Sequence, residues 1–101
     1  MTQSQTETRQ QAVAALVLTI AQSLVEHPEQ CTVLAVGTSA TCLIEIACAM
    51  EDCGRIIGKH RTRLEAIQVL ARAAAKQEFR VVEVELVGAG GLRAGPRKEG
   101  C

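Results

Sequence analysis

The spacing of apolar residues changes several times along this chain, and the order of these changes constrains the fold more than any other feature. Residues 13–24 place apolar side chains on one face of a helix, and Pro28 prevents that helix from continuing. Residues 32–36 and 41–48 are rich in Val, Ile and Thr, and Gly37-Thr38-Ser39 between them predicts the turn of a β-hairpin. The first half therefore predicts the order α-β-β.

The second half predicts two helices and a last strand. A short helix is predicted over residues 50–57, with Glu51 and Asp52 in its first turn, where carboxylates complement exposed N–H groups. A longer helix is predicted over residues 61–77, and the alternation in residues 79–87 predicts a third strand. The expected fold is α+β, with the order α-β-β-α-α-β and helices packed on one face of a three-stranded sheet. The longer helix is expected to bury Leu64, Ile67, Leu70, Ala71 and Ala74.

Length and polarity predict one domain with two polar ends. Residues 1–8 are expected to form a disordered tail, residues 9–87 the domain, and residues 88–101 a flexible, glycine-rich, basic tail. The apolar stretch from Ala12 to Val25 is interrupted by polar residues and is shorter than the roughly 20 apolar residues that span a bilayer. No basic leader precedes it. We therefore expect a soluble, cytoplasmic protein with no membrane partner.

The reactive side chains show no pattern typical of catalysis or metal binding. The histidines His27 and His60 lie far apart, and no CxxC spacing occurs, so no metal site is expected. The sequence shows no nucleophile–base pair and no phosphate loop of the Walker kind. We expect no catalytic residues, no cofactor and no enzyme activity. The five cysteines, expected to be reduced thiols, are Cys31, Cys42, Cys48, Cys53 and Cys101.

Charge is distributed unevenly along a chain that is neutral overall. Residues 1–52 hold six acids and one base, a net charge of −5, whereas residues 53–101 hold ten bases and five acids, a net charge of +5. Four Arg and Lys side chains and no carboxylate lie between Arg55 and Arg63. This local cluster favours an anion-binding face over ordinary solvated charge.

The glycine within the cluster makes a specific kind of anion site possible. Gly58 lies between two predicted helices, and the second helix presents unpaired backbone N–H groups at its start. A residue without a Cβ also lets a phosphodiester backbone come close. Lys59, His60 and Arg61 add positive charge around this turn. On its own, Gly58 would be interpreted as a simple helix C-cap, and His60 as a solvated loop residue.

The aromatic content restricts how such a site would hold a nucleic acid. Tyr and Trp are absent and Phe79 is the only Phe, so a platform of stacked rings cannot form. Binding would depend on a backbone clamp, charge and aliphatic contact. Ile56, Ile57, Leu64 and Ile67 would supply an aliphatic wall, although each taken singly is typical of a core. The candidate binding residues are Arg55, Ile56, Ile57, Gly58, Lys59, His60, Arg61, Arg63, Leu64 and Ile67.

Five segments match one known family pattern: Glu51–Lys59, Leu64–Ile67, Ala73–Lys76, Val81–Val84 and His27-Pro28-Glu29. Through them, residues 11–87 resemble the small single-domain KH RNA-binding proteins of bacteria, the KhpA-type family. The resemblance implies a type II KH fold and binding of short single-stranded RNA at the loop around Gly58. It also implies homodimers or pairing with a larger KH-containing protein, and a role as a post-transcriptional regulator or RNA chaperone.

One departure from the family pattern affects the loop. The family loop runs Gly-Lys-x-Gly, whereas this chain has Arg61 at the fourth position. The arginine side chain would either obstruct the closest approach of the RNA backbone or hold a phosphate with its guanidinium. We expect binding that is retained but altered. The alternative is a protein-interaction module with a degenerate loop, in which Ala66, Val69 and Ala73 of the long helix would suit an interface.

Overall fold

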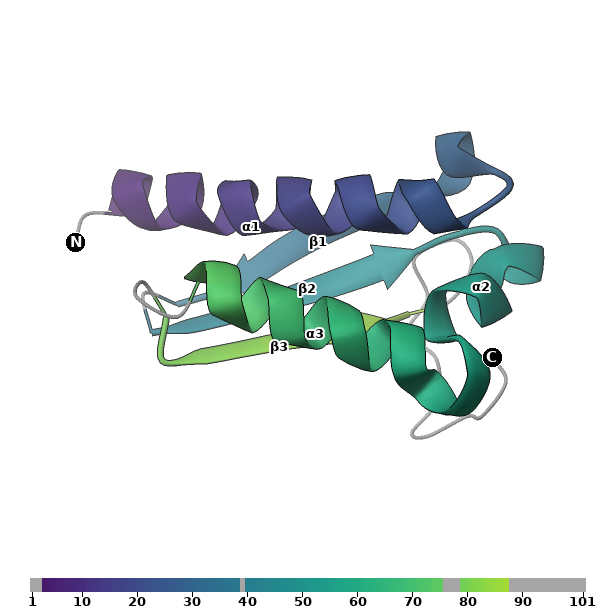
Figure 1. Cartoon of the computed structure of the whole chain (residues 1–101). Coiled ribbons are helices and arrows are strands. Elements are labelled where there is room, and N and C mark those ends of the chain that lie inside the picture. Colours follow the sequence, from purple (N-terminus) through teal and green to yellow (C-terminus); the bar gives the residue numbers. More distant parts are fainter. Residues whose placement is uncertain (1–2, 39, 76–78, 88–101) are drawn as a thin grey trace.

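The computed structural model describes residues 3–38, 40–75 and 79–87 of the chain (Figure 1). The predicted order α-β-β-α-α-β is confirmed, with short 3₁₀ turns (η) added between the main elements. The predicted tail, residues 88–101, lies outside the described residues. The elements are α1 (Gln3–Leu24), η1 (Pro28–Gln30), β1 (Thr32–Gly37), β2 (Thr41–Ala47), η2 (Met50–Asp52), α2 (Cys53–Ile57), η3 (Lys59–Arg61), α3 (Thr62–Ala75) and β3 (Val81–Leu86).

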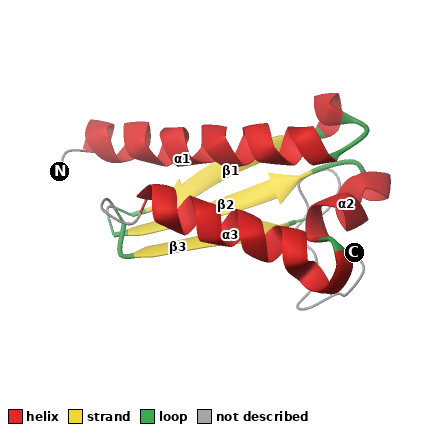
Figure 2. Ribbon diagram, in the orientation of Figure 1, coloured by secondary structure: helices red, strands yellow, loops and turns green. Residues whose placement is uncertain are grey.

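The three strands form one mixed sheet in the order β1-β2-β3. The hairpin strands β1 and β2 are antiparallel, with Gly37 paired to Cys42 next to the turn. Strand β3 pairs parallel to β2 after the crossover through α2 and α3. Figure 2 shows α1 and α3 lying across the same face of the sheet, as the sequence predicted. The crossover therefore brings the start of α3 and the end of β2 to one end of the sheet.

The core lies between this face of the sheet and the two long helices. Strand β2 alternates as predicted: Ile44 and Ile46 are buried against the helices. The other face of the sheet carries exposed Leu34 and Val36 on β1. The buried apolar side chains from the helices include Val17, Ala21, Ile56, Leu64, Ile67 and Ala71. Cys31 and Cys42 are buried free thiols, and the buried Cys48 and Cys53 lie with their Sγ atoms 3.9 Å apart. Cys101 lies outside the described residues.

Helices α1 and α3 differ from the prediction in detail. Helix α1 begins at Gln3, within the segment predicted to be disordered, because Gln, Glu and Arg favour helix and no Gly or Pro interrupts them. Helix α3 exposes Leu70 and Ala74, and buries Ala75 instead. Leu70 and Ala74 each precede a buried residue. Because successive residues of a helix are rotated by about 100°, the side chains of Leu70 and Ala74 point away from the core. None of the helices in the described part of the chain is long and apolar enough to cross a membrane.

Candidate nucleic-acid interface

The turn between α2 and α3 requires glycine at position 58. The Gly58 N–H donates to the carbonyl oxygen of Gly54 at 2.8 Å and closes α2. Gly58 then adopts φ 75° and ψ 172°, a region populated almost only by glycine. A Cβ at this position would lie 2.8 Å from Cγ and 3.0 Å from the backbone N of Arg63. Gly58 is therefore more than a helix cap: it allows α2 and α3 to meet at this angle.

The two residues that follow Lys59 hold left-handed backbone conformations. His60 has φ 58° and ψ 29°, and Arg61 has φ 63°. The turn is closed by a hydrogen bond from the Arg61 N–H to the Gly58 carbonyl at 3.1 Å. The Thr62 hydroxyl donates to the Lys59 carbonyl at 2.8 Å. Arg61 thus holds a conformation that glycine adopts without strain.

The side chains of residues 59–61 are accessible to solvent, and Lys59 and Arg61 carry positive charge. Lys59 and His60 are exposed and Arg61 is half-buried. Among residues 3–38, 40–75 and 79–87, no ion pair joins any of the three to a carboxylate. The loop is not covered by the acidic side chains of the described chain. These three side chains are therefore available to an external anion.

Arg55 and Arg63, which the sequence placed with this group, are engaged within the protein. The Arg55 guanidinium lies 2.9 Å from Glu26 Oε2 through Nη2 and 3.5 Å from Asp52 Oδ1 through Nε. Arg63 donates from Nη1 to the Arg55 carbonyl oxygen at 2.9 Å. The predicted cluster of positive charge therefore divides into a loop part and a part that contacts the rest of the fold.

Asp52 is a carboxylate with no solvent exposure beside this site. Its oxygens accept hydrogen bonds from the backbone N–H groups of Glu26 at 3.1 Å and His27 at 3.0 Å, and lie 3.1 Å from His27 Nδ1. Burial acts to raise the pKa of Asp52, but these hydrogen bonds outweigh it, and the pKa lies below its ordinary value. The predicted place of Glu51 and Asp52 in the first turn is confirmed, but the Asp52 side chain makes no cap hydrogen bond to α2.

Three of the four predicted wall residues lie in the core. Ile56, Leu64 and Ile67 are at most 3% exposed, because they occupy the faces of α2 and α3 that pack toward the sheet and α1. Ile57 alone is half-buried and presents part of its side chain at the surface. The wall predicted from the sequence is therefore reduced to Ile57, and the other three support the loop from beneath.

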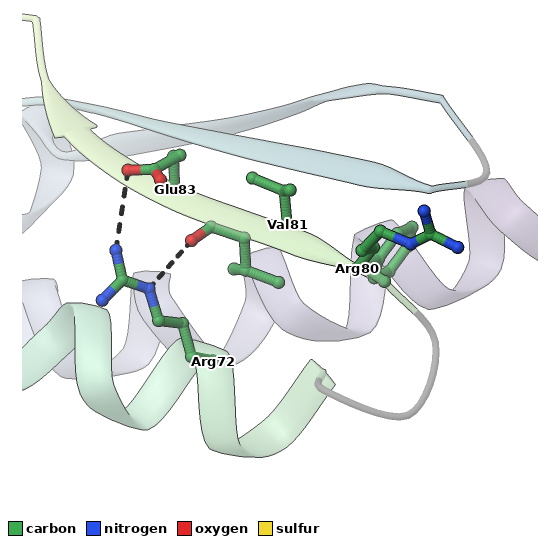
Figure 3. Close-up of a pocket in the computed structure, with 6 residues that line it drawn as sticks. Arg72, Arg80, Val81 and Glu83 are labelled. Atoms are coloured by element: carbon green, nitrogen blue, oxygen red, sulfur yellow. Dashed lines mark hydrogen bonds and ion pairs between the residues drawn. The ribbon is translucent and has the colours of Figure 1, made fainter.

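A shallow pocket of about 340 Å³ lies between the end of α3 and the start of β3. Arg72 donates from Nε to the Val82 carbonyl at 3.1 Å, and its Nη2 lies 3.6 Å from Glu83 Oε1 (Figure 3). The Arg80 side chain extends away from Arg72 at the other end of the pocket (Figure 3). Sequence reasoning missed this site because its arginines lie outside the 55–63 cluster. The lining residues are Arg72, Phe79, Arg80, Val81, Val82 and Glu83.

Comparison with known proteins identifies the family of this chain. The sequence profile of the family described as "KhpA/KhpB, KH domain" matches residues 14–86. RNA-binding protein KhpA of Caldanaerobacter subterraneus subsp. tengcongensis is 39% identical over 72 residues, which cover 71% of this chain and 96% of the relative. The protein of the same name from Clostridium acetobutylicum is 38% identical over the same shares.

RNA-binding protein KhpA of Listeria monocytogenes is 29% identical over 72 residues, which cover 71% of this chain and 95% of the relative. No solved structure matches the chain with significant similarity. The matched region spans α1 from Ala14 through β3, and so includes the whole sheet and the loop at Gly58. The chain therefore belongs to the KhpA/KhpB family of KH-domain proteins.

Proposed function

We propose that this chain is a non-enzymatic RNA-binding protein that grips short single-stranded RNA at the loop from Gly58 to Arg61. The observation that carries the proposal is the solvent-accessible positive charge of Lys59 and Arg61, which form no ion pair among the described residues, on a turn built around Gly58. Membership of a KH-domain family whose relatives are named RNA-binding proteins supports the same function. A single strand suits this site because no stacking platform is needed for a backbone clamp.

Arg61, the fourth residue of the loop, changes how the loop binds RNA without abolishing binding. Arg61 carries a guanidinium that forms two parallel hydrogen bonds with a phosphate more readily than an ammonium does. Its Cβ keeps the RNA backbone farther from the turn than a glycine would. Charge therefore replaces part of the close backbone approach. Ile57 offers the aliphatic contact for a base that the loop leaves unstacked.

We place this binding in the cytoplasm, in post-transcriptional regulation or RNA chaperone activity. Pairing with a second copy, or with a larger KH-containing protein, is supported by the outer face of α3. Val69 is 62% exposed and Leu70 50% exposed, and Ala66 and Ala73 lie one helical turn to either side of Val69. Such an apolar stripe on an exposed helix is typical of a protein-binding surface. Arg93, Arg97 and Lys98 lie outside the described residues; bases in such a tail would suit a solvated extension or add weak, non-specific contacts to RNA.

The alternative is an interaction module whose loop no longer binds RNA. The apolar stripe on α3 favours this interpretation, whereas the unpaired charge of the loop opposes it. The two functions are separable, because Lys59 and Arg61 lie on the loop and Val69 lies on the exposed side of α3.

The test is a salt series of binding to mixed-sequence single-stranded RNA. If the loop neutralises about three phosphates, log K should fall with log salt at a slope near −2. Lys59→Glu with Arg61→Glu should abolish binding, because it places two negative charges where the phosphates lie. Circular dichroism and thermal unfolding would verify that the double variant folds. Equal affinities of the wild type and this variant would leave the interaction module as the better explanation.

A further inference from the structure

Behind the loop, charged side chains connect the end of α1 to the start of α2. We call Glu26, His27, Asp52, Arg55 and Arg63 the brace. Asp52 is its centre, because its fully buried carboxylate receives the backbone N–H groups of Glu26 and His27, which lie 25 residues or more away in the sequence. A buried carboxylate that loses its partners is costly, so these contacts tie the two segments together.

The brace continues from Asp52 to the backbone of the loop. Arg55 lies across the gap between Asp52 and Glu26, with a close contact of 2.9 Å to the Glu26 carboxylate. The carbonyl of Arg55 accepts a hydrogen bond from Arg63 at 2.9 Å. The stem of Arg63 in turn lies directly under Gly58, where an added Cβ would come within 2.8 Å of its Cγ. The contacts thus run from Asp52 through Arg55 to Arg63, and Arg63 packs against Gly58 of the turn.

The charge of Arg55 differs in kind from the charge of Lys59. Arg55 is balanced by one exposed carboxylate and one buried carboxylate, whereas Lys59 is exposed and has no carboxylate partner among the described residues. Moving Arg55 onto a phosphate would leave the charge of Asp52 with fewer partners. Lys59 can reach a phosphate without breaking any ion pair of the described chain.

We propose that Asp52 and Arg55 are positioning residues, which hold the turn from Gly58 to Arg61 in its binding shape through Arg63 and do not contact RNA. This inference rests on the proposed binding of RNA by the loop. It gives the basic residues between positions 55 and 63 two roles. Residues of the loop contact phosphate, and Arg55 holds the loop in position. Arg55, a candidate RNA contact by sequence, belongs to the second role.

The matched pair Arg55→Gln and Lys59→Gln tests the proposal, because each variant removes one positive charge. Binding to mixed single-stranded RNA would be measured across a salt series. Lys59→Gln should reduce the steepness of the salt slope by about 0.7, the value for one lost phosphate contact on a single strand. Arg55→Gln should weaken binding by roughly two- to fivefold, the range of an exposed ion pair, without changing the slope. Amide hydrogen exchange at positions 59–61 should be faster in Arg55→Gln and unchanged in Lys59→Gln.

A third variant, Arg55→Lys, keeps the charge but cannot span Glu26 and Asp52 with a planar fork. It should therefore resemble Arg55→Gln in affinity and in amide exchange. A wild-type affinity for Arg55→Lys, or a shallower slope for Arg55→Gln, would overturn the proposal in favour of a direct contact. Unchanged affinity and exchange in Arg55→Gln would overturn it as well. An unchanged slope in Lys59→Gln would instead contradict the proposed function of the loop.

Discussion

At the scale of single residues, Arg61 combines two opposing effects. Its φ of 63° lies in the left-handed region, where a side chain with a Cβ is strained. Its guanidinium also adds positive charge to the loop that we propose as the phosphate site. Strained backbone of this kind is common at binding sites, which is consistent with that proposal.

Two substitutions at position 61 separate strain from charge. Both Arg61→Ala and Arg61→Gly remove the guanidinium, but only glycine also removes the Cβ. We expect Arg61→Gly to have a free energy of unfolding about 1 kcal/mol higher than Arg61→Ala, because glycine fits a positive φ. Chemical denaturation monitored by circular dichroism measures this difference. A higher stability for the alanine variant would show that the backbone at position 61 does not hold a positive φ in solution.

Single residues also show why the candidate site could be located from sequence but not resolved. Gly58 and its basic neighbours are adjacent in the chain, so the local pattern by itself identifies the turn. The partners of Arg55 are Glu26 and Asp52, and Glu26 becomes a neighbour only when the end of α1 packs against η2 and α2. Local patterns hold no information on such distant pairs. The positive charges near Gly58 could therefore be identified from the sequence, but the carboxylate partners of Arg55 could not.

At the scale of elements, α3 shows what apolar periodicity can and cannot predict about burial. The spacing identified the helix and placed Leu64, Ile67 and Ala71 in the core. It assigned Leu70 to the core as well, because hydrophobicity alone does not distinguish a core stripe from an apolar stripe on the outside. The sheet that α3 contacts decides which side is buried. Helix α1 likewise extends into polar sequence that has no apolar periodicity to reveal it.

Ile67 and Val69 make a matched pair for the two faces of α3. Ile67→Ala should lower the free energy of unfolding by about 2–5 kcal/mol, because it leaves a cavity in the core. Val69→Glu should change that free energy by about 0.5 kcal/mol or less in the monomer, as expected for a surface position. If the stripe pairs two copies, Val69→Glu should convert a dimer to a monomer in light scattering. A wild-type protein that remains monomeric at high concentration would contradict pairing of two copies.

At the scale of the whole molecule, the brace links stability to pH. The hydrogen bond to Asp52 raises the pKa of His27 above its ordinary 6.5, and the charges of Asp52, Glu51 and Glu29 act in the same direction. The pKa of Asp52 is lowered from its ordinary 3.8. Protonated His27 therefore stabilises the fold below pH 6.5, and this contribution is lost as the pH rises through the pKa of His27 in the folded protein. Ionised Asp52 stabilises the fold above pH 3.8, and this contribution is lost as the pH falls through the pKa of Asp52 in the folded protein.

Stability should therefore be greatest between the two ordinary pKa values and should decline above pH 6.5. Thermal unfolding from about pH 2.5 to 8.5 measures this dependence on both sides. In His27→Gln, the loss of stability above pH 6.5 should disappear. The loss of stability at acid pH should remain, because Asp52 still accepts hydrogen bonds from the N–H groups of residues 26 and 27. A decline of the same size in His27→Gln would assign the effect to another group.

The parallel pairing of β2 and β3 has a practical consequence for work on this protein. The Val87 N–H donates to the Ile46 carbonyl at 2.8 Å, so the chain leaves the sheet at the end where α2 lies. Helix α1 runs along the sheet for roughly 33 Å, and its first residue lies at the opposite end (Figure 1). If RNA binds at the loop around Gly58 as proposed, a fluorophore or affinity handle attached ahead of Gln3 would lie at the opposite end of the sheet from the nucleotides. The same attachment after Val87 would begin at the end of the sheet where α2 lies, which is the end of the proposed site.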